Sequence, residues 1–448
     1  MREQGTRWGG FECRAAMGMT AVVEAGAGAE TEVPAGLRGC RDCGFEQQVP
    51  ALSAHEVACC QRCGGTLERQ APAGGRLALA LVFTACLLLI PANFMPLMTI
   101  SFQGAIRENW LISAFPALQS DGFPILGSVV VAYTVVAPVV WAVSLAVVLG
   151  FVELGGQVEL GGRSGERRRL PAWLGPLFRL VETVRPWAML DVYLVGSFVA
   201  YTRLGDVADV EIDLGGWTLI ALALTMLLID PALDRAAIWR AIGSGDLVRP
   251  GDASVECEHC GLLAPRTMSG HRCPRCRAVL HPRKPFSLRR TSALVIAAYL
   301  LYIPANLLPV MTIVRFGRRI PNTILSGVVE LVSDDMLPLA LIVFLASIAV
   351  PLFKLIGLTW FLISIRLNGP SHLVTQTKLY RVIEVIGRWS NIDVFMVSIL
   401  VALIQFGILT RIQADAGVFA FAGVVFLTML ASNSFDPRLM WDNEEEKT

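Results

Sequence analysis

Most cysteines of this sequence have the spacing of metal ligands. Of the 11 cysteines, eight form four Cys-x-x-Cys pairs, two in residues 40–63 and two in residues 257–276. Four thiolates on two tight turns suit a tetrahedral zinc ion and leave no open coordination position, so the pattern predicts two structural zinc ribbons. Redox or iron–sulfur chemistry is the alternative interpretation. The predicted ligands are Cys40, Cys43, Cys60 and Cys63 for one ion, and Cys257, Cys260, Cys273 and Cys276 for the other.

The backbone at each pair must turn tightly around the metal. Glycine follows Cys43, Cys63 and Cys260, and it allows the conformation that such a turn requires. Arg277 stands at the fourth of these positions, and we expect it not to prevent metal binding.

The composition indicates a membrane protein. The chain of 448 residues is 54% hydrophobic and only 17% charged, which is too apolar for an ordinary soluble protein. A helix of about 20 apolar residues crosses a hydrocarbon core of about 30 Å. Amphipathic helices are expected at the membrane surface at 173–185 and 378–388. The eight predicted spans are about 77–96, 124–150, 187–201, 215–233, 293–314, 337–365, 392–409 and 418–432.

Two self-matches indicate that the chain is duplicated. Segments 90–100 and 303–313 are identical at eight of eleven positions, and segments 179–200 and 381–402 match with the pattern R-x-x-E-x-x-x-x-W-x-x-x-D-V. We therefore predict a polytopic α-helical membrane protein of two tandem repeats, each a zinc ribbon followed by a four-helix transmembrane bundle. The predicted parts are a disordered leader (1–38), zinc ribbon 1 (39–70), transmembrane bundle 1 (76–234), zinc ribbon 2 (252–284), transmembrane bundle 2 (289–435) and a cytoplasmic tail (436–448).

The distribution of Lys and Arg predicts the orientation in the membrane. Basic residues are concentrated in segments 151–186, 235–290 and 366–388, and the intervening loops carry few. Because basic loops stay in the cytoplasm, both termini and both ribbons are expected there. Reducing conditions in the cytoplasm agree with free thiolates on a metal. Such ribbons often bind nucleic acid, but a span follows each one closely, so docking at the membrane face is favoured and no nucleic acid partner is expected.

Polar residues within the spans need a reason, because an ionisable one costs about 2.5–3.5 kcal/mol on insertion scales. Lys354 either faces an interior cavity or a carboxylate, or extends its ammonium toward the membrane surface. Asp393 and its repeat counterpart Asp191 either interact with a helix dipole or belong to a polar site. In the second case Asp393 pairs with Lys354 as a proton-sensitive site. Asn93 and Asn306 lie between prolines, where they either satisfy backbone groups or contact a ligand.

The motifs of common enzymes are missing from the sequence. It contains no HExxH, P-loop, GxSxG or dinucleotide-binding fingerprint, so we expect that the protein is not an enzyme. Without a nucleotide site, transport would be driven by an ion gradient or by a partner protein, or would not be driven at all.

The paired ribbons, the repeated IPAN-x-x-P-x-M-T-I segment and the terminal SFDPRLMWD stretch (434–442) resemble the paraquat-inducible protein A family over about residues 38–442. The resemblance implies an inner-membrane protein of a Gram-negative bacterium. It also implies that the protein passes phospholipid or another lipophile to a periplasmic partner with mammalian-cell-entry (MCE) domains, and that the eight cysteines are metal ligands. Two alternatives remain open: an ion-driven exporter of toxic amphiphiles that acts alone, and a zinc- or redox-responsive membrane sensor.

Overall fold

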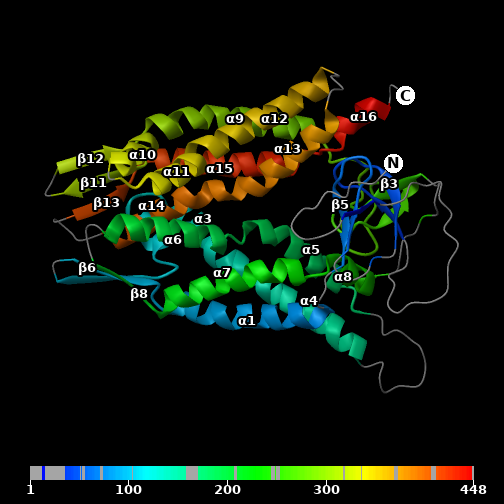
Figure 1. Ribbon diagram of the computed structural model, residues 1–448, viewed down its shortest axis with the longest axis horizontal. Helices are drawn as coiled ribbons and strands as arrows, with labels where there is room; N and C mark the ends of the chain where they lie inside the picture. Colours follow the sequence, from blue (N-terminus) through cyan, green and yellow to red (C-terminus); the bar gives the residue numbers. More distant parts are fainter. Residues whose placement is uncertain are drawn as a thin grey trace.

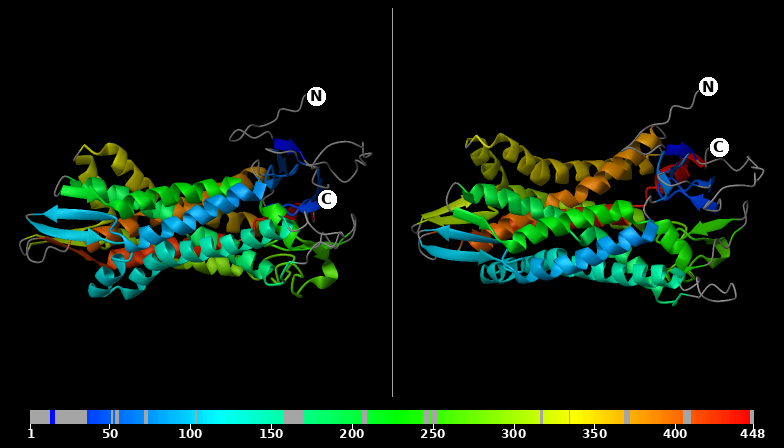
Figure 2. Two further views of the ribbon diagram at one scale, coloured as in Figure 1. Left: turned by 90° about the horizontal axis from the view of Figure 1, so that it is seen from below. Right: turned by 60° about the horizontal axis from the view of Figure 1, so that its bottom comes forward.

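The computed structural model contains two helical bundles that lie side by side along the long axis of the molecule (Figure 1). The short strands around the two cysteine clusters lie at one end of the molecule, called the ribbon end. Two small sheets lie at the opposite end, called the sheet end. Figure 2 shows the same separation from two further directions. The described residues are 13–15, 36–50, 52, 56–70, 74–102, 104–157, 170–205, 209–243, 248, 253–315, 318–333, 335–367, 372–404 and 410–445. The leader expected at 1–38 lies almost wholly outside them.

The first half begins with short hairpin strands around the first cysteine cluster. They are β2 (Gly36–Gly39), β3 (Glu46–Val49), β4 (Val57–Cys59) and β5 (Thr66–Arg69), with β1 (Cys13–Ala15) parallel to β4. The following elements are α1 (Gly74–Phe94), β6 (Met98–Phe102), β7 (Ala105–Asn109), α2 (Ala114–Ser120), α3 (Pro124–Val131), η1 (Ala132–Val136), α4 (Ala137–Gln157), α5 (Leu174–Val184), η3 (Arg185–Trp187), α6 (Leu190–Gly205), β8 (Asp209–Ile212), α7 (Leu214–Ala232) and α8 (Arg235–Ile242).

The second half follows a similar order. Its elements are β9 (Ser254–Glu256), β10 (Leu263–Pro265), η4 (Arg266–Met268), α9 (Ser287–Leu307), β11 (Met311–Arg315), β12 (Arg318–Asn322), α10 (Ile324–Ser333), α11 (Leu337–Phe344), η5 (Leu345–Ala349), α12 (Val350–Arg366), α13 (Leu373–Ile386), η6 (Gly387–Asn391), α14 (Ile392–Leu403), β13 (Thr410–Ala414), α15 (Ala416–Ser434) and α16 (Leu439–Glu445).

One long helical stretch in each half contains a π-helical turn. Both π turns, η1 and η5, end just before a proline, Pro138 in α4 and Pro351 in α12. Proline has no backbone N–H and cannot complete the regular hydrogen-bond pattern, so a wider turn lets the helix continue past it. The helices therefore stay continuous over Pro124–Glu153 and Leu337–Arg366.

Seven helical stretches of the described chain are long and apolar enough to cross a membrane, whereas the sequence predicts eight. Helix α6 falls short because its 16 residues span about 24 Å, less than a hydrocarbon core of about 30 Å. The amphipathic segment predicted at 378–388 is not separate from the following span. It belongs to one 31-residue stretch, Leu373–Leu403, in which α13, η6 and α14 follow each other directly. The seven stretches are Gly75–Phe94, Pro124–Glu153, Leu214–Ala232, Ser287–Leu307, Leu337–Arg366, Leu373–Leu403 and Ala416–Ser434.

The repeated segment Ile90–Ile100 is the place where a long helix leads into a sheet. At its centre, the carbonyl of Pro96 accepts a hydrogen bond from the N–H of Gly215, at the start of α7. A Cβ atom at Gly215 would lie 2.4 Å from that carbonyl oxygen, so only glycine fits. The second half contains the same contact between Pro309 and Gly417, again with 2.4 Å from a Cβ to the oxygen.

The two sheets at the sheet end are antiparallel and have three strands each. In the first, β6 lies between β7 and β8, and Met98 is opposite both Asn109 and Ile212. In the second, β11 lies between β12 and β13, and Met311 is opposite both Asn322 and Ala414. Each sheet thus ties the end of one long helix to the start of another.

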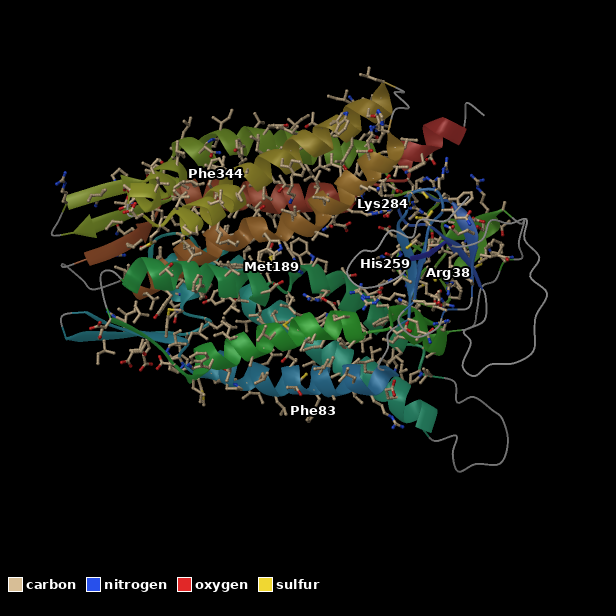
Figure 3. All side chains as sticks on the ribbon, in the orientation of Figure 1. Arg38, Phe83, Met189, His259, Lys284 and Phe344 are labelled. Carbon is tan, nitrogen blue, oxygen red and sulfur yellow. The ribbon has the colours of Figure 1, made fainter. Side chains whose placement is uncertain are left out.

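The two bundles meet where α6 packs against α14. The rings of Tyr193 and Phe395 lie 5.6 Å apart there in an edge-to-face arrangement. Gly196 allows the close approach, because a Cβ atom at this position would lie 3.2 Å from the carbonyl oxygen of Ile392. Met189, labelled in Figure 3, lies at the same junction.

We predict that Gly196→Leu weakens the junction between the bundles. The larger side chain would press on the backbone of α14, and overpacking of this kind costs about 1–3 kcal/mol. Thermal unfolding of the purified protein in detergent measures the effect. Gly150→Leu is the control, since no atom lies within 4 Å of a Cβ at that helical position. Equal stability of the two variants would contradict the assigned contact.

Candidate metal centres and buried polar residues

The structure brings the eight predicted ligand cysteines together in two groups of four. In each group all sulfurs lie within 4.8 Å of one another, and all eight side chains are buried. The distances between paired sulfurs are 3.5 Å for Cys40–Cys63 and for Cys43–Cys60, 3.4 Å for Cys257–Cys276, and 3.6 Å for Cys260–Cys273. Sulfurs around a tetrahedral ion with a Zn–S distance of about 2.3 Å are about 3.8 Å apart, so both groups have the size of a metal site.

The electrostatics of each cluster also fit a cation. Four thiolates packed this closely repel one another, so they can all be ionised together only if a divalent ion shares their charge. Since the four sulfurs would fill a tetrahedral shell, the ion would stabilise the fold and bind no substrate.

Backbone conformation explains the glycines after the cysteine pairs. Gly44, Gly64 and Gly261 have φ angles of 75°, 68° and 65°, which favour glycine. Arg277 occupies the fourth equivalent turn with a φ angle of 60°. The arginine thus adopts the conformation of the missing glycine, and the fourth knuckle keeps its shape.

The predicted pair of Lys354 and Asp393 is not formed. Lys354 lies in α12 with an exposed fraction of 1%, and its ammonium makes no hydrogen bond or ion pair with any described residue. Its nitrogen lies against η6, 2.9 Å from the position that a Cβ of Gly387 would occupy. Lys354 is therefore buried beside a backbone rather than extended toward the membrane surface.

The corresponding place in the first half contains a different cation. Lys354 corresponds to Trp141 in the duplicated sequence, and Gly387 corresponds to Arg185. The Arg185 guanidinium lies over the ring of Trp141, 5.1 Å from its centroid, and forms an ion pair with Asp230 at 2.6 Å. The two halves therefore place a cation in the same region from different elements. The Arg185–Asp230 pair was not predicted from the sequence, although Asp230 lies within an apolar run and was a usable signal.

The two repeat-related aspartates have different surroundings. Both lie in the first turn of a helix, Asp191 in α6 and Asp393 in α14. Asp191 forms an ion pair with Arg388 of the second half at 3.2 Å. Asp393 instead lines a small pocket.

The pocket is apolar and has room for water but not for a lipid in this conformation. Asp393 is the only charged residue in its lining. The other lining residues are Val310, Met311, Thr323, Ile324, Gly327, Val343, Met396, Val397, Val418 and Phe421.

Asn93 and Asn306 bond to their own helices. The amide of Asn93 donates to the carbonyl of Leu89 at 2.7 Å, and the amide of Asn306 donates to the carbonyl of Tyr302 at 2.8 Å. These contacts agree with the structural alternative, in which each asparagine satisfies a backbone group.

The terminal motif 434–442 fastens the start of α9 to the end of α15. Asp436 accepts hydrogen bonds from Arg438 and from the backbone N–H of Lys284, and its own N–H donates to the hydroxyl of Ser287. Burial alone would raise the pKa of Asp436, but the hydrogen bonds and charge of Arg438 outweigh it and hold the pKa below its ordinary value. The motif is therefore a structural clamp at the ribbon end.

We predict that each cysteine cluster accounts for one bound metal ion. Cys60→Ser and Cys273→Ser should each lower the metal content of the purified protein from about two ions per chain to about one, because a thiolate ligand is lost. Elemental analysis checks the stoichiometry. The control is Cys86→Ser, since Cys86 lies in α1 outside both clusters. Full metal content in either cluster variant would contradict the assignment.

Comparison with known proteins places the chain in a family. The family model described as Paraquat-inducible protein A matches residues 76–243 and 288–445. Intermembrane transport protein PqiA of Escherichia coli (strain K12) is 29% identical over 416 residues, covering 91% of this chain and 96% of the relative. Lipophilic envelope-spanning tunnel protein A of the same strain is 30% identical over 416 residues, covering 92% and 93%.

A third relative, the Probable intermembrane transport protein of Haemophilus influenzae (strain ATCC 51907 / DSM 11121 / KW20 / Rd), is 26% identical over 431 residues, covering 92% of this chain and 97% of the relative. No solved structure matches the chain. The family model covers most of both bundles, and the relatives are matched over nearly their whole length. The chain therefore belongs to the paraquat-inducible protein A family.

Proposed function

We propose that this protein is the inner-membrane component of an intermembrane lipid transport system. It would pass phospholipid or a related lipophile between the inner membrane and a periplasmic partner with MCE domains. The printed names of two relatives, which refer to intermembrane transport and to a lipophilic envelope-spanning tunnel, support this class of function. Those names describe transport proteins, which agrees with the expectation that the chain is not an enzyme.

The observation that carries the proposal is the difference between the two bundles. In the first bundle the buried cation Arg185 is neutralised by Asp230 and held over an aromatic ring. In the second bundle Lys354 has no such partner among the described residues, and Asp393 lines an apolar pocket. A buried ionisable group in a membrane is costly, and retaining one favours a functional role over a structural one. We assign transport to the second bundle, with Lys354 and Asp393 as its proton-sensitive polar residues.

The proposed topology places the ribbon end in the cytoplasm. The exposed arginines Arg266, Arg272, Arg289 and Arg290 belong to the ribbon and to the first turn of the following helix, and basic residues near a membrane favour the cytoplasmic side. The sheet end would then face the periplasm, where the partner is expected. In this topology α6 is the eighth span when the preceding turn η3 is counted with it, which gives four spans in each bundle. Zinc is the metal in both ribbons because thiolate sets favour it.

We predict that Lys354→Ala or Asp393→Ala abolishes lipid transport while the protein still folds. Each substitution removes one of the two ionisable groups that the proposed site needs. The measurement is complementation of an envelope defect in cells that lack the gene, together with thermal unfolding of the purified variants. Lys378→Ala is the matched control, because Lys378 is exposed on α13. Normal complementation by both site variants would rule out coupling through these residues.

A further inference from the structure

Each ribbon packs against the bundle of the other half. The four cysteines of the first ribbon belong to one apolar cluster with Phe435 and Trp441 of the second half. Those of the second ribbon belong to a cluster with Leu174 and Phe178 of the first half. The ribbons also touch each other at the ribbon end, where Figure 3 labels Arg38 and His259. Chain order alone suggests the opposite pairing.

Close contacts support both crossed interfaces. On one side, the Arg62 guanidinium lies 4.6 Å above the ring centre of Trp441 in α16. On the other side, a Cβ atom at Gly175 of α5 would lie 2.0 Å from the carbonyl oxygen of Arg275, so helix and ribbon are in direct backbone contact. Within its own half, the first ribbon contacts α8, which follows the last span of the first bundle, through an ion pair between Glu68 and Arg240 at 3.2 Å.

Arg381 of α13 joins the second bundle to the first cysteine cluster. Its Nε donates to Oδ2 of Asp42 at 2.7 Å, and its Nη2 donates to Sγ of Cys63 at 3.2 Å. A Cβ atom at Gly65 would lie 2.5 Å from the same Nη2, so glycine leaves the room that the guanidinium needs. Arg381 is the arginine of the motif that the second half shares with the first, where Arg179 corresponds to it.

This geometry suits a thiolate that holds a metal. An N–H group directed at a ligand sulfur withdraws part of its negative charge and orients it, and partners of metal ligands typically change metal affinity by about 10–100-fold. The planar guanidinium can bind the carboxylate of Asp42 and the sulfur of Cys63 at the same time, whereas the single ammonium of a lysine cannot do so in the same geometry.

Arg381 and the backbone beside Lys354 belong to one continuous helical stretch, Leu373–Leu403. Helix α13 ends at Ile386, and the next residue, Gly387, is the one against which the Lys354 ammonium lies. In addition, the hydroxyl of Tyr380, next to Arg381, donates to the carbonyl of Ser432 in α15 at 3.1 Å. A shift of α13 relative to the first ribbon would therefore move the backbone beside Lys354.

We propose that Arg381 is a positioning residue through which the metal site of the first ribbon holds helix α13, and with it the Lys354 region, in place. The first ribbon thus acts on the second bundle rather than on the bundle that follows it in the chain. The consequence for transport rests on the proposed function, but the contact between ribbon and helix does not.

Hydrogen–deuterium exchange of the full-length protein in detergent, with zinc bound and after chelation, tests this proposal. In the natural protein, chelation should raise exchange in residues 373–391. In Arg381→Gln, exchange in this segment should already be raised with zinc present, chelation should add little, and zinc should leave the first ribbon about 10–100-fold faster. Arg381→Lys keeps the charge and should restore part of the protection.

Three comparisons make the result specific. Arg41→Gln is the matched control, because Arg41 neighbours Asp42 but bonds to the carbonyl of His259 in the second ribbon rather than to α13. Arg179→Gln should leave zinc at the first ribbon unchanged. Cys273→Ser should raise exchange in α5 and not in 373–391.

The proposal is overturned if chelation still raises exchange in 373–391 of Arg381→Gln as much as in the natural protein. It is equally overturned if that segment does not respond to zinc at all. Should Arg381→Gln fail to fold, Asp42→Asn breaks the same ion pair from the ribbon and carries the same two predictions. A normal exchange response together with failed lipid transfer would count against the proposed function alone.

Discussion

A charge inside a bilayer must be neutralised or hydrogen-bonded, because no water is available to solvate it. Two ion pairs among the described residues follow that constraint, and Lys354 departs from it. Arg185 pairs with Asp230 within the first half, and Asp191 pairs with Arg388 across the junction of the halves. Lys354 has neither kind of partner among the described residues. Its ammonium nitrogen lies against Gly387 of η6.

Duplication explains how such a departure can arise. Two related bundles build the membrane body, so one can keep a neutralised cation while the other retains a cation without an ion-pair partner among the described residues. The glycine contacts at Pro96 and Pro309 are the same in both halves, as is the order of helices and sheets. The buried cation, by contrast, comes from different elements: it is Arg185 of η3 in the first half and Lys354 of α12 in the second. The two halves therefore share their backbone architecture but differ in the buried cation.

Much of this arrangement could be predicted from the sequence, for reasons that differ between residues. The Cys-x-x-Cys spacing identified both clusters, since the geometry of a metal turn is local. The long apolar runs identified most of the spans. The crossed docking of the ribbons could not be predicted, because it depends on contacts such as Arg381 to Cys63, which are far apart in the chain. Nor could the sequence show that Lys354 and Asp393 form no hydrogen bond or ion pair in the described structure, because helical depth places two residues at one level of a membrane but does not say which way each faces. Their joint role in a proton-sensitive site stays a prediction.

The contact between the cysteine ribbons and the helical bundles follows from the small size of the ribbons. Small ribbons lack a core of their own, and here their cysteines belong to apolar clusters that the bundles complete. Helix α13, which contacts the first ribbon through Arg381, leads directly into Gly387 beside Lys354, and from this continuity we infer that the ribbon and the Lys354 region are coupled. Family membership supplies the context of transport, and the second bundle supplies the residues that would carry it.

The most direct measurement is transfer of a labelled phospholipid from vesicles that contain this protein and the proposed MCE-domain partner to acceptor membranes. The account predicts transfer that requires this protein and exceeds that of vesicles with the partner alone. Transfer at the same rate with and without this protein would contradict it.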